Sequence, residues 1–154
     1  MVKIEDTMHQ LGLTLPEAPK PVASYVPFVR TGNLVYTSGQ ICLEKGELKF
    51  KGKAGREYSV EQAYEAAQLC CLNALAVVKS AIGDLDRVSR VVKVVGFVNS
   101  APGFNAQPKV VNGASDLLVK VFGEAGKHAR SAVGCSDLPM DTTVEVEIIV
   151  EVKD

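Results

Sequence analysis

The segment Val144-Glu145-Val146-Glu147-Ile148-Ile149-Val150-Glu151-Val152 decides the fold class, because every even position holds a β-branched residue. Successive side chains of a strand point to opposite faces of a sheet, so this period of two predicts a strand with one buried face. The odd positions hold glutamates and one isoleucine, which together are too polar for a core. We therefore expect a C-terminal strand whose second face lies open.

Arg130 stands fifteen residues before Glu145, at the start of the short apolar run Arg130-Ser131-Ala132-Val133-Gly134-Cys135. If the two segments pair as neighbouring strands, the guanidinium and the carboxylate can meet on the face opposite the core. A planar fork that is always charged suits a small carboxylate, because two parallel hydrogen bonds fix its position and orientation. The alternative is an ordinary cross-strand ion pair, and these residues alone do not separate the two.

The composition predicts one soluble domain. A chain of 154 residues with 47% hydrophobic content is long enough to bury a substantial core and short enough to form a single domain. Its 17 basic and 18 acidic residues give a net charge of −1, without the concentration of Lys and Arg that a nucleic-acid surface requires. Because the N-terminus lacks the apolar run of a signal peptide and no membrane-length apolar stretch follows, we expect a cytoplasmic protein outside the membrane.

The cysteines and histidines do not form a metal-binding pattern. No C-x-x-C pair occurs, and the two adjacent cysteines fall inside a helical pattern, so we expect structural thiols in a reducing compartment. Two histidines without a carboxylate cluster at ligand spacing predict no metal site. The residues concerned are Cys42, Cys70, Cys71, Cys135, His9 and His128.

The N-terminal half predicts an extension followed by strands. Residues 1–22 contain a possible short amphipathic helix and a proline-bearing segment, which we expect to form a surface appendage, and residues 23–154 form the domain. Residues 33–42 have the β-branched and aromatic content of a strand. The turn residues Lys45-Gly46-Glu47 lead into a second short strand at residues 48–51, so the two predict a hairpin.

Two helices and a central strand are predicted after the hairpin. Ser59-Val60-Glu61-Gln62 matches a capping box, small apolar residues recur every three or four positions after it, and Gly83 is placed as a C-terminal cap. Residues 88–98 are almost continuously β-branched, which is typical of a strand covered on both faces. Pro108 then opens a second helix that ends at Gly123.

This order of elements predicts an α+β protein with a mixed β-sheet and two helices packed on one face. The second face of the sheet is then uncovered, although its central strand is apolar on both sides. A symmetric homo-oligomer that packs sheets together, with polar clefts between subunits, resolves that conflict.

The order of several short motifs resembles the Rid (reactive intermediate deaminase) superfamily, also called the YjgF or L-PSP endoribonuclease family. The resemblance runs from about Tyr25 to Glu151, and its combination of motifs is specific although each motif alone is weak. The motifs are Ala23-Ser24-Tyr25, Gly32-Asn33-Leu34, Ser38-Gly39-Gln40-Ile41, Phe122-Gly123-Glu124, Ala129-Arg130-Ser131, Leu138-Pro139 and Val144-Glu145-Val146-Glu147.

The resemblance implies a chorismate-mutase-like fold and a homotrimer with a cleft at each subunit interface. It also implies hydrolysis of small enamine or imine 2-carboxylates, such as 2-aminoacrylate, to a 2-keto acid and ammonia. That chemistry demands no cofactor, because a free 2-imino acid hydrolyses readily once it and a water are oriented.

The resemblance also assigns roles position by position. Arg130 matches the arginine that grips the substrate carboxylate, and Glu145 matches the glutamate near the attacking water. Tyr25 matches a cleft tyrosine, and Ser38-Gly39 lies in the strand that borders the pocket.

Three departures place the chain in a divergent branch. Ala132 stands where well-studied members have a cysteine, and Cys135 should point to the opposite face from Arg130. Counting back from Phe122 places Ser115 where the family has a cleft asparagine, and Asn112 is the alternative. His128 replaces a usual proline on the same face as Arg130, where it either donates to a ligand or is a satisfied rim histidine.

Two other functions compete with the deaminase. The same cleft could bind a small carboxylate without turnover. The endoribonuclease or translation-inhibitor activity in the family's name is less favoured, because the near-zero charge and two histidines offer little for phosphate binding or acid–base chemistry.

Overall fold

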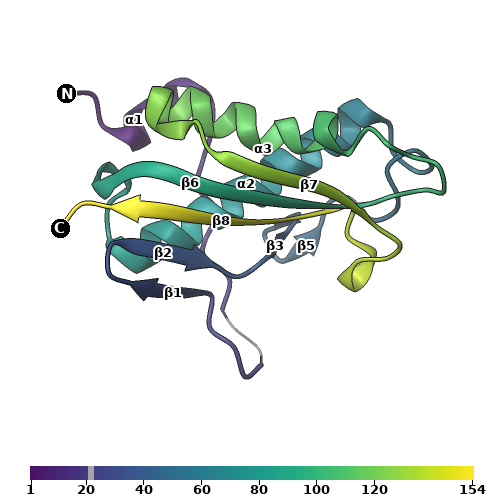
Figure 1. Cartoon of the computed structure of the whole chain (residues 1–154), viewed down its shortest axis with the longest axis horizontal. Coiled ribbons are helices and arrows are strands. Elements are labelled where there is room, and N and C mark those ends of the chain that lie inside the picture. The colour runs from purple at the N-terminus through teal and green to yellow at the C-terminus, as the bar shows by residue number, and fades with distance from the viewer. Residues whose placement is uncertain (21–22) are drawn as a thin grey trace.

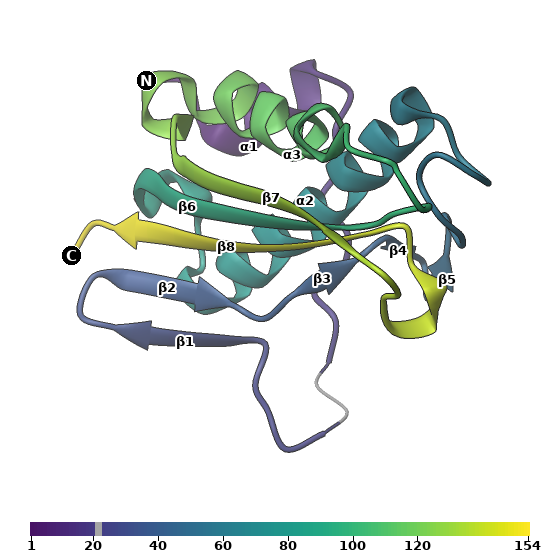
Figure 2. The same ribbon diagram turned by 45° about the vertical axis from the view of Figure 1, so that its right-hand side comes forward.

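A computed structural model describes residues 1–20 and 23–154, in which two long helices cover one face of a mixed β-sheet (Figures 1 and 2). This architecture confirms the predicted fold class. In chain order the helices and strands are α1 (Ile4–Gln10), β1 (Phe28–Thr31), β2 (Leu34–Thr37), β3 (Gln40–Ile41), β4 (Leu43–Glu44), β5 (Glu47–Leu48), α2 (Val60–Ile82), β6 (Val88–Asn99), α3 (Gln107–Phe122), β7 (Ala129–Cys135) and β8 (Val144–Val152), with short 3₁₀ turns at Leu85–Arg87, Gly123–Gly126 and Pro139–Asp141.

The helix α2 begins and ends where the sequence predicted. The Ser59 hydroxyl accepts from the Gln62 backbone amide at 3.2 Å, and the Gln62 side chain accepts from the Ser59 amide at 2.9 Å, which completes the capping box. Gly83 ends the helix with a φ of 85°. Of the helices described, α2 alone is long and apolar enough to cross a membrane, but its residues are mostly buried, as in a core helix.

The helices α2 and α3 pack closely because a glycine lies between them. A Cβ added at Gly113 would lie 2.0 Å from the carbonyl oxygen of Tyr64, so only a residue without a side chain fits at this crossing. Pro108 lies in the first turn of α3, as predicted.

The sheet order is β1-β2-β8-β6-β7, with β3 also paired to β8 (Figure 2). Among the strand pairs of this sheet that the structure describes, β6–β7 alone is parallel. In β8 the even residues are buried and the odd residues half-buried, which confirms the predicted alternation. The even residues lie under the helices; for example, the Cys70 thiol on α2 donates to the Val144 carbonyl at 3.3 Å.

The strands β7 and β8 do not pair, so the condition under which Arg130 and Glu145 could meet is not fulfilled. The strand β6 lies between them, antiparallel to β8 and parallel to β7. The strand β7 begins about 30 residues after β6 ends, and the local pattern of residues does not predict that these two strands pair.

The N-terminal strands also differ from the prediction. The predicted strand 33–42 is broken at Ser38-Gly39 into β2 and β3, and the unforeseen β1 pairs with β2. The turn at Lys45 and Gly46 was placed correctly, with positive φ at both residues, but it joins the two-residue strands β4 and β5 instead of longer ones.

The first residues of the chain are docked on the domain, contrary to the predicted surface appendage. Met8 on α1 is 2% exposed within the hydrophobic core, and the Ile4 amide donates to an Asp86 carboxylate oxygen at 2.7 Å. Glu5 pairs with Lys79 on α2. The predicted boundary after residue 22 falls beside Pro21 and Val22, which lie outside the described residues, so the domain division stays a prediction.

The face of the sheet away from the helices carries exposed apolar side chains. Val29 on β1, Tyr36 on β2 and Val133 on β7 are 55%, 40% and 44% exposed, and Tyr36 lies between the buried Val35 and Thr37. We call this face the open face. Such a surface is what an interface with further copies of the chain would use.

Candidate functional site

Arg130 is half-buried and carries its charge without a carboxylate partner. Its Nη1 donates to the Asn112 side-chain oxygen at 2.8 Å and to the Ser115 hydroxyl at 3.2 Å, both on α3, which lies beside β7 (Figure 1). Among residues 1–20 and 23–154 no acidic group forms an ion pair with it, and its Nε and Nη2 make no hydrogen bond. The two contacts fix the guanidinium plane and leave the Nε–Nη2 edge for a ligand.

His128 joins the same group through Ser115. Its Nε2 lies 2.9 Å from the Ser115 hydroxyl oxygen, and its Nδ1 lies 2.6 Å from the Gly126 carbonyl oxygen. The structure thus brings together Arg130, Asn112, Ser115 and His128, which we call the arginine cluster. Both candidates for the asparagine position contact the guanidinium, and His128 shares the face of Arg130 as predicted.

The hydrogen bonds settle the tautomer of His128. A carbonyl oxygen only accepts, so Nδ1 carries the proton, and Nε2 of the neutral ring accepts from the Ser115 hydroxyl. Burial lowers the pKa of His128, and the charge of Arg130 lowers it further. The imidazole is therefore neutral near pH 7.

A second group of residues predicted for the site is connected to Glu145 through the break between β2 and β3. A Cβ added at Gly39 would lie 2.6 Å from the Glu145 Oε2, so the carboxylate rests against the break between β2 and β3. The adjacent Ser38 hydroxyl donates to the Val26 carbonyl at 2.6 Å, which ties the segment that carries Tyr25 to this break. Tyr25 itself is 55% exposed. We call Glu145, Gly39, Ser38 and Tyr25 the glutamate cluster.

Glu145 holds its proton more tightly than an ordinary glutamate. Burial raises the pKa of Glu145, and the negative charge of Glu147 on the same face raises it further. A carboxylate with a raised pKa is a better match for proton transfer near neutral pH than an exposed one.

The two clusters lie on opposite faces of one sheet. Arg130 stands beside Val94, a core residue under the helices, whereas Glu145 stands beside Phe97, whose position alternates to the open face. Their strands are also two strand spacings apart, roughly 10 Å. The two side chains therefore do not meet within one chain, and the alternative of a cross-strand ion pair is wrong.

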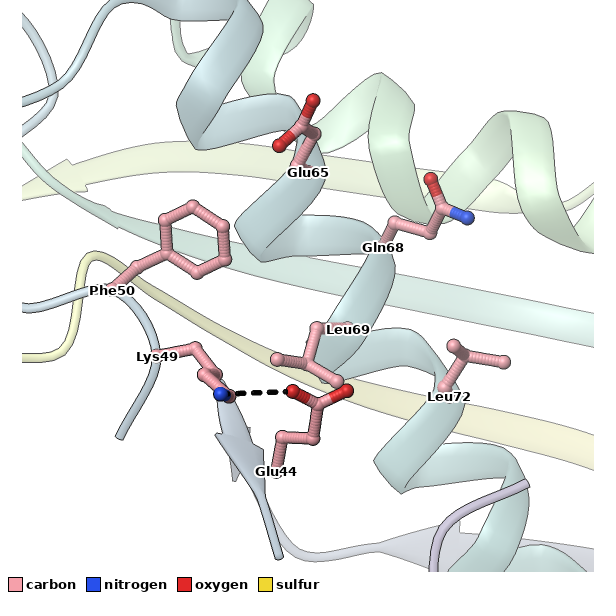
Figure 3. Close-up of a pocket in the computed structure, with 7 residues that line it drawn as sticks. All are labelled: Glu44, Lys49, Phe50, Glu65, Gln68, Leu69 and Leu72. Atoms are coloured by element: carbon pink, nitrogen blue, oxygen red, sulfur yellow. Dashed lines mark ion pairs between the residues drawn. The ribbon is translucent and has the colours of Figure 1, made fainter. Parts of the chain in front are cut away.

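The surface has two hollows. One lies away from both clusters, and the other is lined by His128 of the arginine cluster. A hollow of about 270 Å³ opens between the β4–β5 hairpin and α2, where Lys49 pairs with Glu44 at 3.2 Å (Figure 3). No residue predicted for the site lines it. A second hollow, of about 310 Å³, is lined by Leu34, Arg90, Val91, Val92, Lys127, His128, Ala129 and Glu151.

The cysteines and acidic residues of the described ranges form no group of three or more metal-ligating side chains. Cys42, Cys70 and Cys71 are buried free thiols, and Cys135 is half-buried. Cys135 is offset by five residues from Arg130 along β7 and so faces the other way, as predicted.

Sequence reasoning missed the backbone groups of the site. The Gly126 carbonyl orients His128 and the Val26 carbonyl holds Ser38, and neither carbonyl has a signature in residue type. The close approach of Gly39 to Glu145 had a weak signal, because a glycine inside a strand pattern often marks a close contact.

The chain belongs to the family described as "YjgF/chorismate_mutase-like, putative endoribonuclease", whose sequence profile matches residues 5–152. This confirms the resemblance drawn from the motifs. The match begins inside the segment that the sequence had set apart as an extension.

Relatives and solved structures agree with this assignment. Protein TCP17 of Trypanosoma cruzi is 42% identical over 150 residues, covering 97% of this chain and 94% of that protein. A 2-iminobutanoate/2-iminopropanoate deaminase of Dermatophagoides farinae is 32% identical over 141 residues, covering 92% and 95%. The crystal structure of Atu1372 from Agrobacterium tumefaciens, of unknown function, has a TM-score of 0.92 at 48% identity, covering 97% and 92%. That of E. coli TdcF with bound serine has a TM-score of 0.64 at 25% identity, covering 90% and 94%.

Proposed function

We propose that the protein is a cofactor-independent hydrolytic deaminase of small enamine or imine 2-carboxylates, such as 2-aminoacrylate, and that it releases a 2-keto acid and ammonia. The observation that carries the proposal is the half-buried Arg130, whose Nη1 is held by two neutral groups and whose Nε–Nη2 edge has no partner in the described chain. A lone guanidinium in this state attracts a small anion, and two parallel hydrogen bonds would orient it.

We infer that each site is shared between two copies of the chain. One copy would supply the arginine cluster, and the next would supply Glu145, Ser38, Gly39 and Tyr25. Two findings support this: the clusters face opposite ways in one subunit, and the open face exposes apolar side chains that a second copy could cover. The arrangement is a homotrimer, as the resemblance to the family implies.

In this site the protein has little covalent chemistry to perform. Arg130 would bind the carboxylate, and Glu145 would accept a proton from the water that attacks the imine carbon. The raised pKa of Glu145 makes the glutamate able to return that proton to the departing ammonia. Tyr25 would close the pocket.

The relatives support the proposed substrate class. One is named as an imine deaminase, and one solved structure contains serine, which is a small amino acid with the same carboxylate. Other family members carry the name endoribonuclease, but the net charge of −1 offers no surface for a phosphate backbone.

The test is ammonia release from 2-aminoacrylate that a dehydratase generates in the assay. Replacing Arg130 by Lys keeps the charge and loses the fork, so we expect kcat/KM to fall about 10- to 100-fold, or roughly 1.4–2.8 kcal/mol. Arg56→Lys, on an exposed turn, is the matched control and should behave as wild type. If wild type releases no ammonia but binds a 2-keto acid through Arg130 in calorimetry, the protein is a carboxylate-binding module instead.

A further inference from the structure

Ser115 and His128 have the geometry of a nucleophile and its base. The Ser115 oxygen lies 2.9 Å from His128 Nε2, which is within the reach that activated serines show. The Gly126 carbonyl, 2.6 Å from Nδ1, orients the ring from its other side. An oriented base beside a hydroxyl is the arrangement that serine hydrolases use, with a backbone carbonyl here in the place of their carboxylate.

The direction of these hydrogen bonds prepares the hydroxyl for attack. Because Nδ1 carries the ring proton, Nε2 is the acceptor, and the Ser115 proton already points at the atom that would take it. Burial and the nearby Arg130 charge keep His128 neutral near pH 7, so the base is in its active form.

Arg130 lies beside the oxygen that would become negative. Its Nη1 donates to the Ser115 oxygen at 3.2 Å, and a fixed cation at this distance stabilises an alkoxide as the proton leaves. The edge of the guanidinium away from Ser115 has no partner among the described residues, so it can hold a carboxylate at the same time.

We propose that Ser115 is an acylating nucleophile, with His128 as its general base, toward small esters whose acyl part also carries a carboxylate for Arg130. The Ser115 oxygen forms a bond to the ester carbonyl carbon, its proton passes to His128 Nε2, and the leaving alcohol takes that proton as the ester bond breaks. Water then attacks the acyl-serine, gives a proton to the same nitrogen and releases the acid, and that proton returns to the Ser115 oxygen.

This activity goes beyond the proposed deaminase. The attack of water on an imine forms no covalent bond to the protein, and it depends on Glu145 of a second copy. Acylation of Ser115 needs only groups that one chain holds together: Ser115, His128, Gly126 and Arg130.

The competing interpretation is a structural brace between α3 and the start of β7. A brace lowers the melting temperature when it is cut, but it does not make a hydroxyl reactive. The two interpretations therefore differ in the chemistry of the intact protein.

The experiment treats the folded full-length protein with a fluorophosphonate probe and reads intact mass and peptide maps. We expect a single adduct at Ser115, formed with loss of fluoride, and none in Ser115→Ala. His128→Asn keeps an amide to donate to Gly126 but removes the base, so labelling should slow about 100-fold without loss of the fold. Ser80 lies on α2, where its hydroxyl donates to the Val77 carbonyl, and Ser80→Ala should label as wild type does.

A second measurement tests the role of Arg130. Wild type should hydrolyse the mono-4-nitrophenyl ester of succinate faster than 4-nitrophenyl acetate, and Arg130→Lys should lose that preference. Absence of an adduct, an adduct at another residue, or labelling that His128→Asn leaves unchanged would overturn the proposal. None of these readouts uses ammonia, so labelled Ser115 in a protein without deaminase activity separates this proposal from the previous one.

Discussion

Mixing two inactive variants should restore activity if each site takes Arg130 from one subunit and Glu145 from another. The variants are Arg130→Ala and Glu145→Gln. Within one chain the two side chains face opposite sides of the sheet and lie roughly 10 Å apart across β6, so one subunit cannot place both on one small substrate. Each variant alone should therefore be nearly inactive, while mixed assemblies contain some intact sites.

The expected recovery follows from counting. In an equal mixture of exchanging subunits, half of the chains keep Arg130 and half keep Glu145. A site that draws one residue from each of two neighbours is intact with a probability of one half times one half, or about a quarter of wild type. The fraction is the same for any closed symmetric assembly.

The assay is ammonia release after the subunits have exchanged by mild unfolding and refolding, with mixed assemblies verified by native mass spectrometry. A second mixture, of wild type with the double variant, sharpens the result. A shared site predicts about a quarter of wild-type activity in it, whereas a site within one subunit predicts about half. No recovery in the first mixture, with mixed assemblies present, would refute the shared site.

Three further predictions concern single residues. Gly39→Ala would place a Cβ 2.6 Å from the flexible end of Glu145, so the carboxylate should turn away, and ammonia release should fall about tenfold while the melting temperature stays near wild type; full activity would contradict this. Because the pKa of Glu145 is raised in the folded state, its ionised form destabilises the fold above the ordinary carboxyl range. Glu145→Gln should therefore raise the melting temperature at pH 7, with the gain vanishing below the ordinary glutamate pKa, and an equal gain at every pH would disprove the burial argument. Gly113→Ala would force a Cβ against the Tyr64 carbonyl at 2.0 Å, so it should lower the free energy of unfolding by about 1–3 kcal/mol or more in urea denaturation, and an unchanged midpoint would show that α2 and α3 can separate.

The elements that the sequence predicted well have local causes. The capping box at Ser59 and the glycine cap at Gly83 involve residues a few positions apart, and both are present. Every even position of β8 holds an apolar residue and all but one of the odd positions are glutamates, which indicates the side of the strand that is buried. The observed burial follows this alternation along the whole strand. The arginine cluster was nearly complete in the prediction, because the spacing of His128 and Arg130 placed them on one face and the resemblance to the family pointed to Ser115 or Asn112.

The error that matters most for the site concerns partners that are distant in the sequence. The strand β6, which separates Arg130 from Glu145, ends about 30 residues before β7 begins. No residue pattern in β7 or β8 predicts that β6 lies between them. The break at Ser38-Gly39 was not predicted, and both halves of the predicted strand pair with β8.

The sequence by itself determined α2, α3, β6 and β8, the buried side of β8 and the family that the chain resembles, because these properties depend on periodicity and on contacts between near neighbours. Only the tertiary structure decided that Arg130 and Glu145 face opposite ways. The order of the strands is set when the long connections pack α2 and α3 against the sheet. A shift of one residue in the register of a strand moves its side chains to the other face.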